Sequence, residues 1–158
     1  MIKFTGMLVV VEDIARARAF YEKVLDQRVN MDFGANVEFE GHFSIHLKSL
    51  HQETIGERPI ATRANNTELY FEAEEMEAVQ ERLKQHGVEF VHELREQPWG
   101  SLSMRFYDPD EHMVEVGEPM DVTARRLYQG GMALEEIVRK TGLPREYIAK
   151  AVGNEASS

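Results

Sequence analysis

Apolar and polar positions along the chain predict the same succession of elements twice. A β-branched run at Met7–Val11 is typical of a buried strand, and from Ile14 to Leu25 apolar residues recur every three or four positions, as on one face of a helix. Three short strands follow, and about 60 residues further on the order of strand, helix and three strands returns. The later strands of the first round are expected at 28–33, 36–40 and 43–50, and the second round has strands at 68–73, 88–94, 102–107 and 113–117 around a helix that begins at Met76 and ends before Gly87. The repeat predicts an α+β fold built from paired βαβββ modules.

Segments rich in turn-forming residues divide the chain, because such residues rarely continue a helix or strand. The expected boundaries are 1–51 and 66–118 for the two modules of one domain (1–118), 52–65 for a polar linker, 119–153 for a helical C-terminal extension and 154–158 for a disordered tail.

Three short helices are expected in the extension, at 123–129, 134–141 and 144–152. The spacing of their apolar residues is typical of a helix–turn–helix, but the same pattern is common in helical hairpins. Arg145 and Lys150 supply little of the basic surface that a DNA-reading element needs. Packing of the extension on its own body or on a partner subunit is therefore the favoured interpretation.

Period-two alternation gives four of the expected strands one apolar and one polar face. The apolar faces are expected to pack on the two helices. The polar faces carry Ser44, His46, Lys48, Glu68, Tyr70, Glu72, Ser103, Arg105, Tyr107 and Glu115. A polar face either meets water or lines a cavity. The same alternating pattern in four strands, with Tyr, His and Arg among the polar residues, favours a cavity.

Composition narrows the classes of partner. The 158 residues include no cysteine, which excludes disulfides, thiolate metal sites and cysteine nucleophiles. The net charge of −10 disfavours nucleic acid and anionic membranes as partners. No apolar run approaches the roughly 18 residues of a membrane helix, and the first residues lack the pattern of a secretory signal. We therefore expect a cytoplasmic protein with no membrane partner.

Three stretches resemble the vicinal oxygen chelate superfamily, the group of glyoxalases, bleomycin-resistance proteins and ring-cleaving dioxygenases. Val11–Ile14, followed by Ala19–Leu25, resembles the family's first strand and its helix with a Phe-Tyr pair near the end. Glu68–Glu74 resembles the start of the second module. Arg105–Asp110, followed by Val114–Val116, resembles the family's closing Asp-Pro-Asp-Gly turn and strand, and is the most specific of the three. The resemblance covers both modules and leaves out the helical extension.

Two glycines of the family pattern are replaced in this chain. Asp26 stands where the first helix of the family ends in Gly, and Glu111 stands in the Asp-Pro-Asp turn. Both positions are expected to have a positive φ, which Asp tolerates better than Glu.

The resemblance implies a U-shaped cup of mixed β-sheet formed by both modules, commonly completed in a homodimer. It also implies a divalent metal held by one side chain from the first and last strand of each module, at positions that here read Gly6, His46, Glu68 and Glu115. Because Gly6 has no side chain, the remaining trio of one imidazole and two carboxylates would hold a single Zn, Ni, Mn or Fe, and no cofactor is certain. Without a metal, His46 is a hydrogen-bonded histidine, Glu68 forms an ion pair and Glu115 is a structural acceptor.

A cation is expected beside these carboxylates, since two of them in a partly dry cup raise at least one pKa unless a positive charge lies between them. That cation is a metal, Arg105 or Lys48, and the sequence does not choose among them. The residues expected to contact a ligand are Lys48, Tyr70, Trp99, Ser103, Arg105 and Tyr107, and those expected to transfer protons are Glu68 and Glu115. Trp99 is either a lid that stacks on a ligand or a packing plug.

Three functions fit these residues. The first is a bleomycin-resistance-like protein that binds a small polar or anionic molecule in the cup without chemistry, which the missing side chain at Gly6 favours. The alternative is a metal-dependent lyase or isomerase, in which the metal stabilises an enolate and Glu68 or Glu115 moves the proton. The third is a regulatory module whose extension contacts a partner.

Overall fold

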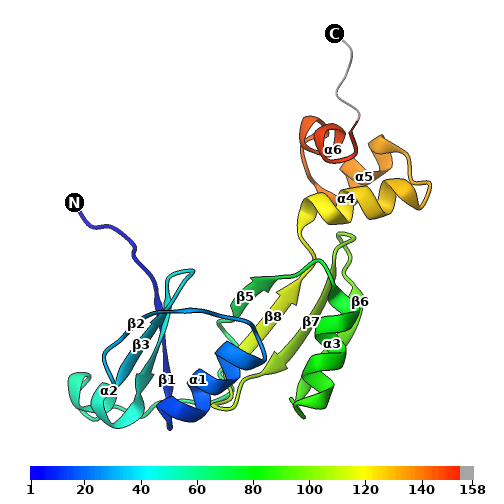
Figure 1. The fold of residues 1–158 in the computed structure, drawn as a ribbon. Helices are drawn as coiled ribbons and strands as arrows, with labels where there is room; N and C mark the ends of the chain where they lie inside the picture. The colour runs from blue at the N-terminus through cyan, green and yellow to red at the C-terminus, as the bar shows by residue number, and fades with distance from the viewer. Residues whose placement is uncertain (154–158) are drawn as a thin grey trace. The chain divides into compact units, whose positions relative to one another are not determined.

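The computed structural model describes residues 1–153 and has a mixed α+β fold (Figure 1). Over these residues it contains two four-stranded mixed sheets and six helices, which confirms the predicted fold class. The disordered tail expected at 154–158 lies outside the described residues. No helix within residues 1–153 is long and apolar enough to cross a bilayer.

The chain divides into two compact units, each of which holds one sheet. The first unit comprises Met1–Glu68, His86–Glu89 and Tyr107–Met113, and the second comprises Leu69–Gln85, Phe90–Phe106 and, among the described residues, 114–153. The first unit therefore takes in a short turn from late in the chain. The boundaries expected for the modules, the linker and the extension stay predictions.

The sheet of the first unit has the order β1-β4-β3-β2, with β1 parallel to β4 and the other neighbours antiparallel. Its elements are β1 (Met7–Val11), α1 (Ile14–Lys23), β2 (Val29–Asp32), β3 (Asn36–Phe39), β4 (Phe43–Leu47) and α2 (Lys48–Thr54). Asp13 caps α1 by accepting a hydrogen bond from the Arg16 backbone N–H at 2.9 Å. The buried face of α1, which includes Tyr21, packs near the inward residues Val37 and Ile45 of the sheet.

The sheet of the second unit repeats this topology, with the order β5-β8-β7-β6 and β5 parallel to β8. Its elements are β5 (Leu69–Glu72), α3 (Met76–Gln85), β6 (Phe90–Glu96), β7 (Leu102–Tyr107) and β8 (Met113–Gly117). Met76, Val79 and Leu83 form the buried face of α3. The same strand order in both sheets confirms the internal repeat inferred from the sequence.

Three helices follow the second sheet and share a core of their own. They are α4 (Met120–Gln129), α5 (Leu134–Thr141) and α6 (Arg145–Ala151). The core consists of Ala124, Leu127, Ile137 and Ile148. Gly142 ends α5 at a φ of 72°, in the left-handed conformation that glycine adopts without steric cost.

Local geometry confirms one detail of the sequence reading and corrects another. Asp26 and Glu111 have φ values of 55° and 66°, as the replaced family glycines predicted. The strand expected at 43–50 ends at Leu47, and Lys48 begins α2, in a region read as strand and linker. The alternation of polar and apolar residues continues for three positions past the strand, and no side chain caps α2, so the sequence carries no signal of the change.

Candidate functional site

One row of polar side chains crosses all four strands of the second sheet. Tyr70 pairs with Glu115 in the parallel ladder, and His92 pairs with Arg105 in the antiparallel one. The Glu118 backbone N–H donates to the Leu102 carbonyl at 2.8 Å, which sets Glu115 opposite Arg105. Because side chains opposite one another in a sheet lie on the same face, these four residues form a continuous line, here called the polar row (Tyr70, Glu115, Arg105 and His92).

An ion pair lies at the centre of the polar row. The Arg105 guanidinium donates from Nη2 to Glu115 Oε2, and its Nη1 lies 3.3 Å from His92 Nε2. The Glu115 side chain is 7% exposed and that of Arg105 is 22% exposed. A buried carboxylate without a counter-charge would favour its neutral form, so Arg105 supplies the cation that the sequence analysis required beside Glu115.

Tyr70 closes one end of the polar row and depends on a glycine for its position. Its hydroxyl donates to Glu72 Oε1 at 3.3 Å, and burial together with Glu72 raises its pKa to about 12, so the phenol is protonated at neutral pH. A Cβ placed on Gly117 would lie 2.8 Å from the Tyr70 hydroxyl oxygen. Glycine at this position therefore leaves the space in which the tyrosine ring lies across the sheet.

Two further expected ligand contacts lie on the β6–β7 hairpin, whose strands carry His92 and Arg105. Ser103, two residues before Arg105 and thus on the same face, is buried, and its Oγ accepts a hydrogen bond from Gln97 Nε2 at 2.9 Å. Trp99, in the hairpin turn, donates from Nε1 to Ser101 Oγ at 2.7 Å and remains 42% exposed. Trp99 is thus held at its polar edge while much of its ring faces solvent.

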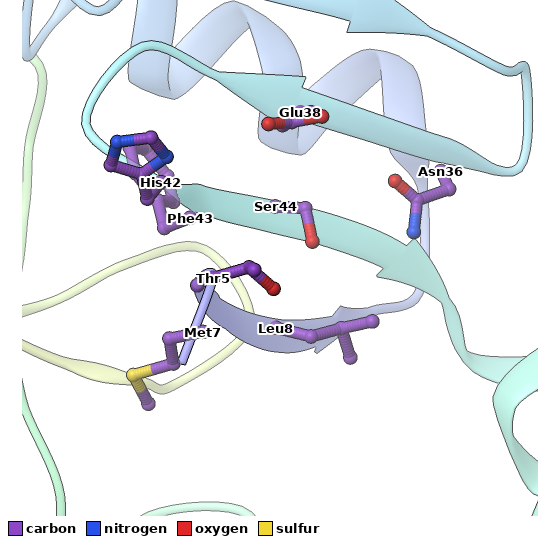
Figure 2. A pocket seen from close by; sticks show the side chains of 9 residues that line it. Thr5, Met7, Leu8, Asn36, Glu38, His42, Phe43 and Ser44 are labelled. Atoms are coloured by element: carbon purple, nitrogen blue, oxygen red, sulfur yellow. The ribbon is translucent and has the colours of Figure 1, made fainter. Parts of the chain in front are cut away.

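The first unit has a pocket of about 400 Å³ on the polar side of its sheet. Figure 2 shows Leu8, Ser44 and Glu38 on neighbouring strands of this pocket, where Leu8 pairs with Ser44 and Ser44 pairs with Glu38. Asn36, Thr5 and His42 are the other polar residues that line it. The pocket therefore presents hydroxyl, amide and carboxylate groups on a sheet face whose opposite side forms the core.

Gly6, at the rim of this pocket, lies in a place that admits no side chain. A Cβ at Gly6 would lie 2.5 Å from the His42 carbonyl oxygen, a contact that real structures do not tolerate. The same carbonyl accepts the hydrogen bond from the Met7 backbone N–H at 3.0 Å, the first link between β1 and the segment before β4. The pairing between β1 and the segment before β4 thus leaves no room for a side chain at this position of the family's ligand set.

Strand register also identifies the repeat counterpart of Glu115. Gly6 and Glu68 are equivalent in the sequence pattern, and two residues after each stand Leu8 and Tyr70. Tyr70 pairs with Glu115, whereas Leu8 pairs with Ser44. Ser44 is therefore the register equivalent of Glu115, and the expected ligand at 46 lies two residues further along β4.

His46 is half-buried, and its Nδ1 has no hydrogen-bond partner among the described residues. Its ring lies edge-on to that of His51 in α2, with centroids 5.7 Å apart. Burial, and to a lesser degree the neighbouring His51, lower the pKa of His46, which favours a neutral imidazole.

The other expected site residues have partners of their own in the first unit. Lys48, the first residue of α2, forms an ion pair with Glu12. The Tyr107 hydroxyl donates to Asn65 Oδ1 at 2.8 Å, and the Arg63 guanidinium lies 4.6 Å from the centre of the Tyr107 ring.

The structure thus brings Tyr70, Arg105 and Glu115 together in the polar row and places Ser103 one row further along the sheet. Glu68 is exposed and precedes β5. The expected proton-transfer role of the two carboxylates stays a prediction.

The predicted metal ligands are divided between the units, with His46 and Glu68 in the first and Glu115 in the second, and their binding of a metal stays a prediction. Across residues 1–153 no group of three or more His, Asp or Glu side chains is placed to hold a metal ion. The first family position cannot carry a side chain, and the Glu115 carboxylate is already bound by Arg105. A metal at Glu115 would have to compete with a guanidinium that is part of the same sheet.

His92 and Gly117 are parts of the site that the sequence reasoning did not single out. His92 lies between two register irregularities in β6, so its face could not be read from period-two alternation. The signal for Gly117 was a glycine at the last position of an apolar strand, where close approach of another group is a common cause.

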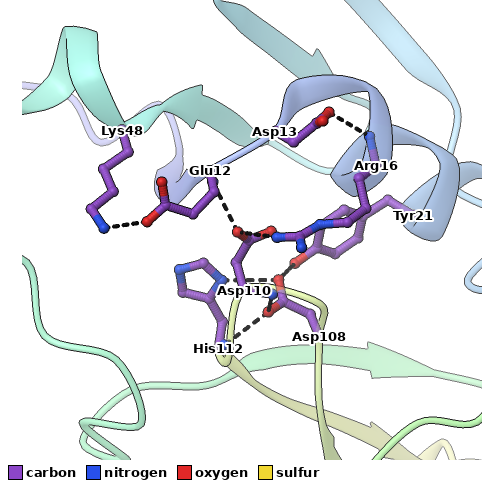
Figure 3. Close-up of polar contacts among 8 residues, drawn as sticks. All are labelled: Glu12, Asp13, Arg16, Tyr21, Lys48, Asp108, Asp110 and His112. Carbon is purple, nitrogen blue, oxygen red and sulfur yellow. Dashed lines mark hydrogen bonds and ion pairs between the residues drawn. The ribbon is translucent and has the colours of Figure 1, made fainter.

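A separate buried polar cluster joins the turn between β7 and β8, within Tyr107–Met113, to α1 in the first unit (Figure 3). The Tyr21 hydroxyl donates to Asp108 Oδ2 at 2.7 Å, and His112 Nδ1 lies 2.9 Å from the same oxygen. Asp110 accepts from Arg16 Nη2 at 2.7 Å. Burial works to raise the pKa of Asp108, but the hydrogen bonds from His112 and Tyr21 outweigh it and lower that pKa, while burial raises the pKa of Tyr21. This cluster holds the Asp-Pro-Asp turn in place.

Comparison with known proteins identifies the family. A family described as "Glyoxalase-like domain" matches residues 4–121. A solved protein of unknown function from Agrobacterium tumefaciens is 37% identical, with a TM-score of 0.69, over 75% of this chain and 95% of that one. At 19% identity, the fosfomycin resistance protein FosX from Listeria monocytogenes has a TM-score of 0.60 over 75% of this chain and 94% of its own. Lactoylglutathione lyase from Agrobacterium tumefaciens, at 22% identity, has a TM-score of 0.56 over 73% of this chain and 92% of its own.

No curated protein matches the sequence. The family match ends within α4, so α5 and α6 lie beyond it. The match over residues 4–121 and the 37% identical structure confirm the resemblance read from the sequence. The chain belongs to the glyoxalase-like domain family of the vicinal oxygen chelate superfamily.

Proposed function

We propose that the protein binds a small polar or anionic molecule at the polar row without a metal, in the manner of a bleomycin-resistance protein. The observation that carries this proposal is the Arg105–Glu115 pair, in which the cation is the more exposed partner, at 22% against 7% for the carboxylate. The guanidinium is thus the more accessible group of the pair, and the carboxylate is covered. Such a surface favours a ligand that brings oxygen acceptors, and the planar guanidinium suits a carboxylate or phosphonate.

Neighbouring side chains supply a flat surface for the rest of such a ligand. Tyr70 is 53% exposed and protonated at neutral pH, and Trp99 is 42% exposed. Aromatic rings of this kind bind planar groups by stacking at a low cost in side-chain entropy. Ser103 lies on the same face but is buried and bonded to Gln97, so its contact with a ligand stays a prediction. Lys48 and Tyr107, which the sequence also predicts as ligand contacts, lie in the first unit and stay predictions.

Relatives support a small-molecule function in general terms. One solved structure of this fold is described as a fosfomycin resistance protein and another as a lactoylglutathione lyase. The low identities show the common fold, and the choice of ligand for this chain rests on its own polar row.

A charge series on one aromatic scaffold tests the proposal. Phenylphosphonate, benzyl alcohol and benzylamine share a ring and differ in charge, and their binding is measured by the NMR shifts of the Tyr70 and Arg105 amides. We expect phenylphosphonate to bind and benzylamine not to bind, because the exposed charge of the row is positive. Arg105→Gln combined with Glu115→Gln removes both charges without leaving either one buried alone, and we expect it to lose phenylphosphonate binding.

Arg18→Gln is the matched control, since Arg18 pairs with Glu22 and Asp32 on the surface of the first unit. It is expected to bind phenylphosphonate like the parent protein. Binding of benzylamine as tight as that of phenylphosphonate, no binding of phenylphosphonate, or unchanged affinity in the double variant would each contradict the proposal.

The alternative function is that of a metal-dependent lyase or isomerase, and a measurement of bound metal distinguishes it from metal-free ligand binding. Elemental analysis of protein purified without chelator is expected to give less than about a tenth of an equivalent of Zn, Ni, Mn and Fe, because a trio that lacks its fourth side chain competes poorly for metal. A full equivalent that falls in Glu115→Gln would instead support enolate chemistry at this carboxylate.

A further inference from the structure

The helical extension is attached to the second sheet by a cluster of charges centred on Arg126 of α4. Its guanidinium donates from Nε to Glu118 Oε1 at 2.8 Å and from Nη2 to Glu118 Oε2 at 2.9 Å. Thr123 Oγ1 also donates to Glu118 at 2.7 Å. Burial works to raise the pKa of Glu118, but the hydrogen bonds from Arg126, Thr123 and the Leu102 backbone N–H lower it, so the pair is ionised at neutral pH.

The same guanidinium also holds the turn of the β6–β7 hairpin. Arg126 Nη2 donates to the Gly100 carbonyl oxygen at 2.6 Å, and Nη1 lies 3.3 Å from Glu96 at the end of β6. Lys140 of α5 forms a second ion pair with Glu96 at 2.9 Å. Two basic side chains of the extension thus bind the hairpin, at Glu96 before its turn and at Gly100 within the turn.

Side chains of the extension also pack directly against the turn. A Cβ on Gly100 would lie 2.9 Å from Lys140 Cε and 3.1 Å from Leu127 Cδ1, so the close approach requires glycine, as does its φ of 95°. Gly100 adjoins Trp99, whose ring nitrogen is fixed by Ser101. The residues that contact Gly100, next to Trp99, thus lie beyond the family match, which ends at 121.

From these contacts we infer that Arg126 is a positioning residue for ligand binding: through the Gly100 carbonyl and Glu118 it fixes the hairpin turn so that Trp99 faces a ligand at the polar row. The inference rests on the proposed function. Only Glu118 and Pro119 separate β8, which carries Glu115, from α4. The extension is thus connected to the polar row both through the chain and through the turn.

Trp99 provides a direct measurement because it is the only tryptophan in the chain. Arg126→Lys keeps a cation beside Glu118 but cannot donate to Glu118 and to the Gly100 carbonyl at once, since an ammonium lacks the fork of a guanidinium. We expect the acrylamide quenching constant of Trp99 to rise about twofold in Arg126→Lys, because the released turn exposes more of the ring. Arg125→Lys is the matched control: Arg125 lies on the same helix and pairs with Asp121 near the surface.

A second variant avoids the buried carboxylate. Lys140→Gln removes the ion pair with Glu96 and part of the packing on Gly100 while leaving the Arg126–Glu118 pair intact. It is expected to raise the quenching of Trp99 in the same direction and by a smaller factor. Thermal unfolding of both variants shows whether a change in quenching occurs in a folded protein.

Phenylphosphonate titration completes the test and separates the two proposals. If the parent protein binds this probe, we expect about fivefold weaker binding in Arg126→Lys and no change in Arg125→Lys, since an ordered contact surface avoids an ordering cost on binding. Unchanged Trp99 quenching, or unchanged affinity in a folded Arg126→Lys variant, overturns the inference. Failure of the parent protein to bind the probe, with quenching raised as expected, overturns the proposed function and leaves the control of Trp99 by Arg126 supported.

Discussion

Replacing Tyr21 by phenylalanine removes a single buried hydrogen bond and little else. The Tyr21 ring is fully buried, and it contacts Phe20, Phe39 and Phe43 with centroid distances of 5.4, 5.6 and 5.2 Å, contacts that a phenylalanine ring would keep. The hydroxyl has one described acceptor, Asp108 Oδ2 at 2.7 Å. Tyr21→Phe therefore tests the worth of one donor to a buried carboxylate.

The expected cost follows from what Asp108 retains. A hydrogen bond to a charged group contributes about 1.5–3 kcal/mol. Asp108 keeps His112 and the backbone N–H groups of Asp110 and His112 as donors, which places the loss near the lower part of that range, at about 2 kcal/mol. For a chain of this length, the melting temperature should fall by about 4–8 °C.

The cost should depend on pH in a defined direction. The pKa of Asp108 is lower in the folded protein than its ordinary value of 3.8, so its contribution to stability is present above pH 3.8 and is lost as the pH falls through the folded value. The Tyr21 hydroxyl is one of the donors that favour the ionised form. Tyr21→Phe should therefore be most destabilising near neutral pH and progressively less so in acid.

Urea unfolding followed by circular dichroism measures this free energy, with Tyr147→Phe as the control. Tyr147 is 43% exposed on α6, and loss of its hydroxyl should change the stability by less than about 0.5 kcal/mol. A cost of Tyr21→Phe no larger than that of the control, or a cost that grows as the pH falls, would show that this hydrogen bond does not stabilise ionised Asp108.

Three further predictions concern single positions. Gly6→Ala should lower the melting temperature by about 4 °C or more, since its Cβ would lie 2.5 Å from a backbone carbonyl oxygen, and thermal unfolding with no change would contradict that geometry. The pKa of His112 is raised, because its hydrogen bond with Asp108 outweighs burial, so its contribution is full below pH 6.5 and is lost as the pH rises through the folded value. His112→Gln should therefore cost more stability at pH 6 than at pH 9 in urea unfolding. Gly117→Ala should displace the adjacent Tyr70 ring, a flexible group, and so weaken phenylphosphonate binding while leaving the melting temperature nearly unchanged.

Much of the fold was predictable because the hydrophobic period changes with each element. The repeat of strand, helix and three strands was visible in the sequence, and the positive φ values of Asp26 and Glu111 followed from the pattern of replaced glycines. The helix at Lys48–Thr54 was not predictable, since three residues of continued alternation resemble the end of a strand. Short segments carry too few residues for either period to be distinguished.

The site was predictable in its residue types and only partly in its partners. Alternation placed Tyr70, Arg105 and Glu115 on polar faces, and strand pairing in the structure sets them in one row. The inclusion of His92 required knowledge of the irregular register of β6, which no period in the sequence reveals. The choice of Arg105 as the cation beside Glu115 required the distance between two side chains on different strands.

Strand pairing also explains why the family's metal set is changed at more than one place. At the first position a side chain is excluded by the same carbonyl that accepts the opening hydrogen bond of β1, so a ligand at Gly6 would disrupt the pairing that positions it. On β4, the neighbouring strand, the register puts Ser44, which carries a neutral hydroxyl, where the second unit has Glu115. In the second unit the carboxylate remains and is neutralised by Arg105 from the adjacent strand. Since a buried charge must be paired, keeping Glu115 requires keeping Arg105, and this guanidinium is the group that we propose to receive an anion.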